Sequence, residues 1–456
     1  MVSGTPWHVM TEWVRTYGSV VRFNFFNLNY IVVADPDLVR HVFATNLKNY
    51  RKDRSSYSPF LPLLGTGADL NCWHGRHTLR SLIGAAFRVE ILAEAATIAL
   101  EATQRLVEKL EGLVAKNGGQ AVVVEMGEEF RLLTLQVIGQ AVLSMSPEES
   151  DRVFPQLYLP IVEEANARTW YPWRALFPTE SWRAYYRCIN ELNAFVTDVI
   201  RRRAHAFDEG RDPCEGRNVD VLDRILLGVQ QAADADDASA GESPFTDEVI
   251  RQLRDEIKTF LFAGHETSSM MLTWTLYELT QNDRCMERVL GEANTVFVPE
   301  VESAGPDYAA FKDLSYSANA LKEALRKYAI VPVVTRQAVE DDVIGRYQIP
   351  AGTRVIVPII AIHQNAELWP QPTAFRPERF ETSPPHAYAW LGFINGPRAC
   401  LGQHFALLES KIVLSRLVQK FRFEACAKTS GDKHPYKIPI CPIDGIHVLV
   451  TPRATQ

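Results

Sequence analysis

The residues around one cysteine near the C-terminal end of the chain suit the binding of a metal. An aromatic residue, a glycine and an arginine precede this cysteine at fixed distances, and a second glycine follows it. In a glycine-rich turn before a helix, backbone N–H groups and the positive helix end face the sulfur, and both favour thiolate over thiol. A thiolate held in this way is a strong axial ligand for haem iron. The pattern comprises Phe393, Gly396, Arg398, Cys400 and Gly402.

The other members of this pattern also suit a haem. Gly396 and Gly402 let the backbone pass close to a flat macrocycle, where a Cβ would collide, and Arg398 can bind a haem propionate through two hydrogen bonds. Most isolated cysteines are buried structural thiols, but the coincidence of fixed identities here predicts that Cys400 is the iron ligand. The pattern resembles the signature Phe-x-x-Gly-x-Arg-x-Cys-x-Gly of the cytochrome P450 family at every fixed position. The resemblance implies that all these residues contact the haem, Phe393 included.

A second segment with candidate chemistry is a long helical pattern from residue 246 to residue 280. It runs unbroken for about 34 residues, roughly 50 Å, and Thr246 can cap its first turn. In its middle lies Ala263-Gly264-His265-Glu266-Thr267. The small residues leave room for a bulky neighbour, and a glycine at such a place is a common cause of a kink or a π-bulge. A hydroxyl beside such a gap can hold a water molecule, and the Glu266 carboxyl can feed protons to it.

This segment has two other interpretations. Gly264 could be a packing site and Thr267 could bond to its own backbone. A His-Glu-x-x-His zinc site is excluded because Ser269 stands where the second histidine should be. The segment resembles the oxygen-activating helix of the cytochrome P450 family, (Ala/Gly)-Gly-x-(Asp/Glu)-Thr-(Thr/Ser). This resemblance implies that Thr267 and Glu266 manage proton delivery and that Ala263 and Gly264 lie against the haem.

The cofactor implied by the resemblance is haem b. Fatty-acid ω-hydroxylases of the family often carry a glutamate at the position of Ala263, and that glutamate can esterify the haem. We therefore expect no covalent link to the haem apart from the bond between Cys400 and iron.

Further residues are assigned to the site by resemblance alone. Glu323 and Arg326 are three apart on a helical pattern, and most such pairs are solvated surface pairs. The segment from Phe375 to Phe380 resembles the family's Phe-x-Pro-Glu-Arg-Phe, which implies a buried triad of Glu323, Arg326 and Arg379 that supports the haem loop. Propionate contacts are implied for Trp73, His77, Arg336 and Arg398; His77 departs from the family's Trp-x-x-x-Arg, and Trp73 could also be a core aromatic residue.

Composition limits the class of protein. The chain has 456 residues, of which 46% are hydrophobic and 23% charged, as in ordinary globular proteins. Its net charge of −7 disfavours nucleic acid as a partner. The seven cysteines include no Cys-x-x-Cys pair, which favours a reducing compartment over a disulfide framework.

No apolar run reaches the roughly 20 residues of a membrane span, and no signal peptide is visible. We expect association with the endoplasmic reticulum or plastid membrane if an N-terminal segment is missing, and a cytoplasmic protein otherwise.

The expected fold is mostly α with a minor β lobe. The sequence predicts a hairpin around Asn27, a helix from Asp35, a helix over residues 90–116 and a mobile acidic connection over residues 231–244. The resemblance implies one catalytic domain over residues 1–456, with haem between the long helix and the cysteine loop. The small β-rich lobe is expected from about residues 18–35, 330–360 and 436–452.

The implied activity is monooxygenation of a lipophilic substrate of the fatty acid, sterol, terpenoid or carotenoid class. Electrons are expected from NADPH–P450 reductase or a ferredoxin, and the protein is expected to be a monomer. The alternatives are a hydroperoxide isomerase or peroxygenase that needs no reductase, and a haem sensor or carrier; the presence of Glu266 and Thr267 disfavours both. The substrate pocket is expected to include Thr259, Phe260, Val331, Val333 and Ile443.

Overall fold

The computed structural model describes residues 5–25, 27–65, 89–211, 218–234, 243–298, 308–435 and 437–453. They cluster into two compact units, each described here by itself. Three helices, α5, α6 and α11, contribute residues to both. That residues 1–456 form one catalytic domain stays a prediction. Unit 1 comprises Met1–Asp53, Ala99–Arg131 and Thr267–Gln456, and unit 2 comprises Arg54–Ile98 and Leu132–Glu266.

The described part of unit 2 is built from helices. Side-chain oxygens cap several of them: for example, Ser146 accepts a hydrogen bond from Glu149 N at 3.1 Å, and Thr179 accepts one from Trp182 N at 3.3 Å. The elements that lie in this unit, wholly or in part, are 3-10 turn η3 (Ser58–Phe60), α3 (Leu61–Leu64), α5 (Val89–Lys116), α6 (Met126–Leu143), α7 (Pro147–Val153), π-turn η4 (Phe154–Tyr158), α8 (Leu159–Trp170), η5 (Pro172–Ala175), α9 (Glu180–Asp208), α10 (Val221–Asp234) and α11 (Asp247–Thr280).

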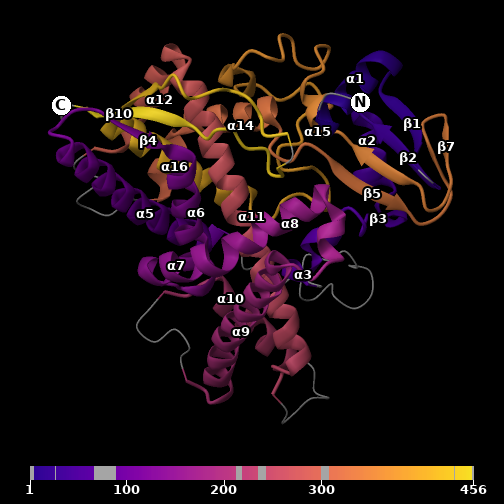
Figure 1. The fold of residues 1–456 in the computed structure, drawn as a ribbon, viewed down its shortest axis with the longest axis horizontal. Coiled ribbons are helices and arrows are strands. Elements are labelled where there is room, and N and C mark those ends of the chain that lie inside the picture. Colours follow the sequence, from indigo (N-terminus) through magenta and orange to yellow (C-terminus); the bar gives the residue numbers. More distant parts are fainter. Residues whose placement is uncertain are drawn as a thin grey trace. The chain divides into compact units, whose positions relative to one another are not determined.

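The long helix α11 begins and ends where the sequence predicted (Figure 1). Thr246 Oγ1 accepts a hydrogen bond from Val249 N at 3.3 Å, which caps the first turn. The expected bulge at Gly264 is absent, because α11 is α-helical at every residue. A Cβ at Gly264 would lie 2.8 Å from Ile138 Cδ1. The glycine therefore admits a side chain of α6, and no π-bulge forms there.

The end of α10 corrects one boundary. The predicted mobile connection was to begin at Gln231, but α10 continues to Asp234. Glutamine and alanine are good helix formers, and Val221, Leu222, Ile225 and Leu226 bury one face of the helix. The rest of the predicted connection, residues 235–242, lies outside the described residues.

Unit 1 holds the strands. The predicted hairpin is confirmed: β1 and β2 are antiparallel, with Val21 opposite Val32. The order of the larger sheet is β1-β2-β8-β5-β3, and β10 lies in a separate sheet of order β4-β10-β9. The predicted strand near residue 450 is thus real but does not join the hairpin's sheet. The strands are β1 (Val20–Phe25), β2 (Leu28–Val33), β3 (Tyr50–Lys52), β4 (Val122–Glu125), β5 (Val334–Ala338), β6 (Asp342–Ile344), β7 (Tyr347–Ile349), β8 (Arg354–Val357), β9 (Phe421–Ala425) and β10 (His447–Pro452).

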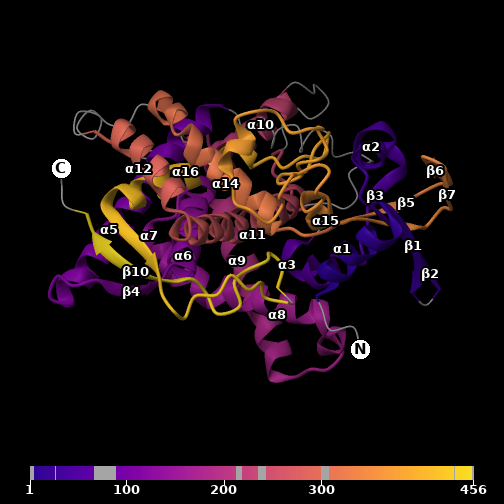
Figure 2. The same cartoon turned by 90° about the horizontal axis from the view of Figure 1, so that it is seen from above.

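Unit 1 also contains helices that lie beside these sheets. In both views the larger sheet lies with α1 and α2, and the β4–β10 pair lies at the other end of the unit (Figures 1 and 2). The predicted cap of α2 is present, since Asp35 Oδ1 accepts hydrogen bonds from Asp37 N and Leu38 N. In the described part of the chain, no helix is long and apolar enough to cross a membrane. The remaining helical elements are α1 (Pro6–Tyr17), α2 (Pro36–Arg40), π-turn η1 (His41–Thr45), η2 (Leu47–Asn49), α12 (Asp283–Val296), η7 (Tyr308–Asp313), α14 (Ser315–Tyr328), α15 (Ile359–His363), η8 (Pro377–Phe380) and α16 (Gln403–Lys420).

Candidate active site

The loop that carries Cys400 is held by its own backbone. Cys400 N donates to Phe393 O at 2.9 Å, and Ala399 N donates to Gly396 O at 3.0 Å. Gly396 has a φ of +88°, and a Cβ there would lie 3.0 Å from the Phe43 carbonyl oxygen. The turn therefore needs glycine both for its conformation and for its close approach to a neighbouring segment. It ends at Gly402, where α16 begins.

The same loop contains a strained residue. Ile394 has a φ of +58°, in the left-handed region that β-branched residues rarely adopt. Its N–H donates to Leu391 O at 3.1 Å, which closes a turn at the start of the loop. Strain of this kind persists only where surrounding contacts enforce it, and it is common at functional sites.

The surroundings of Cys400 correct one expectation. The residue is exposed, yet burial among neighbouring atoms raises the pKa of its thiol, and the hydrogen bond from Gly402 N–H lowers it by less. The loop by itself therefore does not favour the thiolate, because the loss of solvation outweighs the backbone dipoles. A coordinated metal ion removes the proton from a thiol outright. The loop supplies an accessible sulfur, and deprotonation depends on the metal.

The structure brings Glu323, Arg326 and Arg379 together. Glu323 Oε2 accepts from Arg326 Nε at 2.7 Å, and Glu323 Oε1 accepts from Arg326 Nη2 at 2.9 Å and from Arg379 Nε at 3.2 Å. Glu323 and Arg326 are fully buried. Arg326 also donates to the backbone carbonyls of His363 and Pro372. This cluster is a buried, charge-assisted network and not a solvated surface pair.

His363 joins this network to the cysteine loop, and no pattern in the sequence indicates this role. Its carbonyl accepts from Arg326 Nη1 at 2.9 Å, and its Nε2 accepts from Leu391 N at 2.8 Å. Leu391 N–H is the donor at the point where the loop begins. Burial, with the nearby Arg326 charge, lowers the pKa of His363 to about 3. The imidazole is therefore neutral and acts as an acceptor.

This histidine predicts a dependence of stability on pH. The unfolded chain binds a proton at His363 near pH 6.5, whereas the folded chain does so only near pH 3. The contribution of His363 to the free energy of unfolding should therefore be constant above pH 6.5. As the pH drops toward 3, this contribution should decrease by up to about 5 kcal/mol. We expect His363→Gln to flatten this slope in denaturant unfolding at pH 7, 6 and 5. The matched control is His205→Gln at an exposed position; equal slopes in wild type and His363→Gln would refute the assignment.

Arg336 and Arg398 lie beside the same short strand. Arg336, on β5, is opposite Lys52 of β3, and Arg398 Nη1 donates to the carbonyl of Tyr50 in β3 at 2.7 Å. The Arg336 guanidinium also lies over the Phe43 ring, 4.9 Å from its centroid. These residues fit a ligand that carries a metal and two carboxylates. The sulfur of Cys400 suits the metal, and the guanidinium groups of Arg336 and Arg398 suit the carboxylates. Trp73 and His77 lie outside the described residues.

In unit 2, the middle of α11 has both exposed and buried residues. Ala263 is exposed, whereas His265 is completely buried. The carbonyl of His265 accepts a hydrogen bond from Thr134 Oγ1 of α6 at 3.1 Å. His265 Nδ1 lies 3.1 Å from Leu261 O, and its Nε2 lies 3.1 Å from Glu266 Oε1. The sequence singled out Glu266 but not the histidine that it contacts.

Comparison with known proteins identifies the family. The family description "Cytochrome P450" matches residues 1–444. The chain belongs to the cytochrome P450 family. It is 28% identical to Cytochrome P450 4c21 of Blattella germanica, over 97% of this chain and 87% of that protein. It is 27% identical to Protein LUTEIN DEFICIENT 5, chloroplastic, of Arabidopsis thaliana, over 97% and 73%, and 30% identical to a cytokinin hydroxylase of the same plant, over 86% and 72%.

Membership establishes the fold, the reaction class and the kind of cofactor. The fold is the mostly α cytochrome P450 fold with its small β region, as predicted. The protein is a monooxygenase, and members of the family use haem, O₂, a small-molecule substrate and a redox partner. The resemblance found in the sequence is therefore confirmed at the level of family, fold and enzyme class.

The predicted pocket residues of this P450 are divided between the units. In unit 2, Phe260 is half-buried, and Thr259 Oγ1 donates to Asp255 O at 2.9 Å, so its hydroxyl is used by its own helix. In unit 1, Val331 and Ile443 are exposed and Val333 is half-buried. Convergence of these residues on one substrate remains a prediction.

Glu409 is a further buried group of the P450 that sequence reasoning missed. It lies on α16 and is 1% exposed. Burial raises the pKa of its carboxyl well above the usual range, and a hydrogen bond with Ser268 of α11 opposes this only in part. This buried carboxyl group thus links α16, which follows the cysteine loop, to the part of α11 that follows Thr267. In the sequence, Glu409 is an acidic residue on an amphipathic helix. Surface glutamates have the same pattern, so the sequence does not indicate that this residue is buried.

Proposed function

We propose that this P450 holds haem b through Cys400 and otherwise without covalent bonds, and inserts one oxygen atom of O₂ into a lipophilic substrate. The substrate is of the fatty acid, sterol, terpenoid or carotenoid class. The observation that carries the proposal is the Cys400 loop, which presents an accessible sulfur and is enforced by a buried ionic network. Ala263 has only a methyl group, so it offers no carboxylate to esterify a haem.

Other side chains of this protein would bind the propionates, deliver protons and contact the substrate. Arg336 and Arg398 would bind the propionates, and the haem, when bound, supplies the activation of O₂. Glu266 and Thr267 would deliver protons from α11. The predicted pocket residues are mainly apolar, Phe260, Val331 and Ile443 among them, so they suit a substrate of low polarity.

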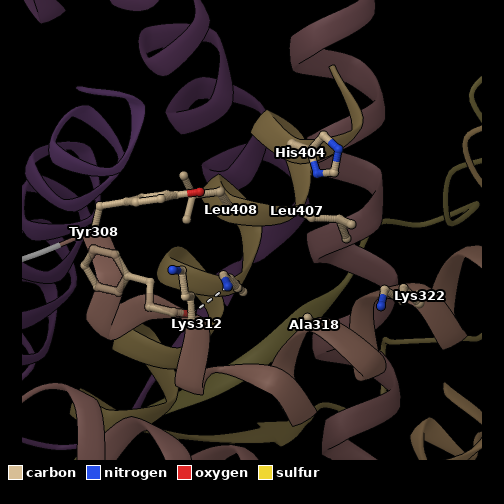
Figure 3. A pocket seen from close by; sticks show the side chains of 9 residues that line it. Tyr308, Lys312, Ala318, Lys322, His404, Leu407 and Leu408 are labelled. Carbon is tan, nitrogen blue, oxygen red and sulfur yellow. Dashed lines mark hydrogen bonds between the residues drawn. The ribbon is translucent and has the colours of Figure 1, made fainter. Parts of the chain in front are cut away.

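A pocket beside α16 supports docking of an external electron donor. Its volume is about 200 Å³ (Figure 3). Helix α16, which begins just after the Cys400 loop, forms one wall; α14 and the short helix η7 form the others. Side chains that carry or can take a positive charge converge here from all three elements. They are Lys312, Lys322, His404 and Lys411.

The basic side chains of this pocket lie close enough together to affect one another. Burial lowers the pKa of Lys322. Burial and the charge of Lys322 lower the pKa of Lys411, although Glu292 and Asp313 raise it. Lys411 Nζ also donates to Phe311 O at 2.5 Å, which fixes it in the wall. Like charges held close together at a surface attract an acidic partner over a distance. We propose that NADPH–P450 reductase or a ferredoxin docks over this pocket, and that the P450 itself is a monomer.

Turnover with labelled oxygen tests both proposals. We expect product to carry one atom from ¹⁸O₂, only when the electron donor is present. The double variant Lys312→Glu/Lys322→Glu should raise the KM for the donor by about tenfold or more at low salt, because it reverses charge at the docking surface. Turnover supported by a hydroperoxide in place of donor and O₂ should be unchanged in this variant.

The control is Lys428→Glu, at an exposed lysine away from the pocket-lining residues. It should leave the KM for the donor unchanged. Product formation without donor or O₂ would support a hydroperoxide isomerase instead. An unchanged KM in the double variant would place donor docking elsewhere.

A further inference from the structure

The carboxylate of Asp342, the first residue of β6, binds two other segments of unit 1. Its Oδ2 accepts a hydrogen bond from the hydroxyl of Tyr50, on β3, at 2.6 Å. The same oxygen lies 2.8 Å from Nε2 of His41, the first residue of the π-turn η1. The rings of His41 and Tyr50 meet edge to face, with their centroids 6.3 Å apart. One oxygen atom of β6 is thus joined to both η1 and β3.

This carboxylate is ionised and largely enclosed. Tyr50 is fully buried, and 14% of the Asp342 side chain is exposed. Burial raises the pKa of Asp342, but hydrogen bonds, those with Tyr50 and His41 foremost, hold the pKa below its usual value. Because an ionised carboxylate can only accept, the Tyr50 hydroxyl and the His41 N–H both donate to it. Hydrogen bonds to a charged acceptor are roughly twice as strong as neutral ones.

The π-turn η1 lies against two parts of the candidate haem site. The carbonyl oxygen of Phe43, in η1, would lie 3.0 Å from a Cβ placed at Gly396 of the cysteine loop. The Phe43 ring lies under the Arg336 guanidinium, whose carbon is 4.9 Å from the ring centroid. A shift of η1 would therefore disturb both the cysteine loop and the orientation of Arg336.

The strand β3 contacts the other guanidinium group of the site. The carbonyl of Tyr50 accepts a hydrogen bond from Arg398 Nη1 at 2.7 Å. The residue whose side chain binds Asp342 thus holds Arg398 through its main chain. Backbone pairing with β5 keeps β3 in its sheet, and the Asp342 carboxylate adds a link from β3 to η1.

We infer that Asp342 is a positioning residue, which holds the two propionate-binding arginines in place through η1 and β3. The inference rests on the proposed function, in which Arg336 and Arg398 bind the haem propionates. Each arginine is anchored on a segment that the carboxylate holds, Arg336 over Phe43 and Arg398 on Tyr50. A guanidinium group binds a carboxylate through two parallel hydrogen bonds only when its planar N–H groups face it correctly. The anchor under each arginine therefore contributes to haem retention.

Haem release from the intact holoenzyme measures this role. We expect Asp342→Asn to release haem to an excess of apomyoglobin about tenfold faster than the wild type, because a neutral amide binds the two donors more weakly than a carboxylate does. The matched control is Asp341→Asn, the same change at the exposed neighbour, whose carboxylate accepts from Ala351 N at 2.7 Å. It should release haem at the wild-type rate. A wild-type rate in Asp342→Asn, or equal acceleration in both variants, would overturn the inference.

A spectroscopic signature separates positioning from general loosening of the fold. Resonance Raman bands of the propionate bending vibrations report the hydrogen bonds that the propionates accept. We expect these bands to shift in Asp342→Asn and in Tyr50→Phe. The control is Tyr316→Phe, which also removes a buried tyrosine hydroxyl from a carboxylate, that of Glu378 at 3.1 Å. Unshifted bands in Asp342→Asn, or an equal shift in Tyr316→Phe, would overturn the inference.

A double variant tests whether Asp342 and Tyr50 act together. Tyr50→Phe removes the hydroxyl but keeps the carbonyl that accepts from Arg398. Because both changes affect the same hydrogen bond, Tyr50→Phe/Asp342→Asn should release haem no faster than the faster single variant, whereas independent effects multiply. Effects that multiply would overturn the inference and leave the proposed function intact. A wild-type protein that binds no haem would overturn the proposed function and the inference with it.

Discussion

The Cys400→His variant should lose the strongly red-shifted Soret band that we expect of the reduced, carbon monoxide-bound wild-type protein. Histidine can still hold the iron, so haem content should persist while the spectrum becomes that of an imidazole complex. Donor-dependent product formation should fall to background, because a neutral nitrogen ligand does not push electron density onto the metal as a thiolate does. Absorption spectra and product analysis of the same preparation measure both effects.

The control for this variant is Cys426→Ser, at a half-buried free cysteine of the same unit. It should retain the red-shifted band and the activity. A red-shifted band in Cys400→His would mean that another sulfur binds the iron. A wild-type protein that binds haem but lacks the band would require the thiolate mechanism to be withdrawn.

The Glu323→Gln variant should be strongly destabilised. Glu323 is fully buried and accepts hydrogen bonds from Arg326, Arg379 and the backbone N–H of Arg376. Loss of its charge leaves the Arg326 guanidinium buried without a counter-charge, which costs about 3–5 kcal/mol. Because Arg326 also anchors His363, we expect the cysteine loop to loosen and haem retention to fall. Denaturant unfolding and haem content after gel filtration measure these effects.

A nearby glutamate offers the control. Glu378 also pairs with arginine, but it is more exposed, and its ion pair with Arg288 is partly solvated. Glu378→Gln should therefore cost less than about 1 kcal/mol and leave haem content unchanged. If both variants lost the same free energy of unfolding and the same haem content, burial of the Glu323 ion pair would not explain the destabilisation.

The sequence predicted best where several residue identities coincide. The Cys400 pattern and the Phe375–Phe380 segment identified the family because their spacing leaves few other interpretations. The grouping of Glu323 with Arg379 could be inferred only by resemblance, since the two lie far apart in the chain. The hairpin β1–β2 and the cap of α2 follow from local turn and capping chemistry, which sequence contains in full.

The sequence failed where burial decides. The helix dipole and nearby N–H groups suggested a thiolate at Cys400, but the pKa of the thiol depends more on desolvation, which a sequence does not display. His363 and Glu409 are single polar residues whose neighbours come from distant segments. Gly264 matched the pattern of a bulge, but the close approach of Ile138 explains it instead.

The way in which Arg326 is bonded has a consequence for how this region can change. Besides Glu323, its guanidinium binds only main-chain oxygens among the hydrogen bonds described, those of His363, Pro372 and Ala374. Main-chain oxygens are present whatever side chains the segment carries. Amino-acid replacements between positions 364 and 374 that preserve the path of the backbone should therefore be tolerated, except at the buried Trp369, whose ring centroid lies 5.6 Å from the Arg326 guanidinium carbon. The scaffold under the cysteine loop is thus robust to mutation in the segment that it holds, and concentrates its vulnerability in a few charged side chains.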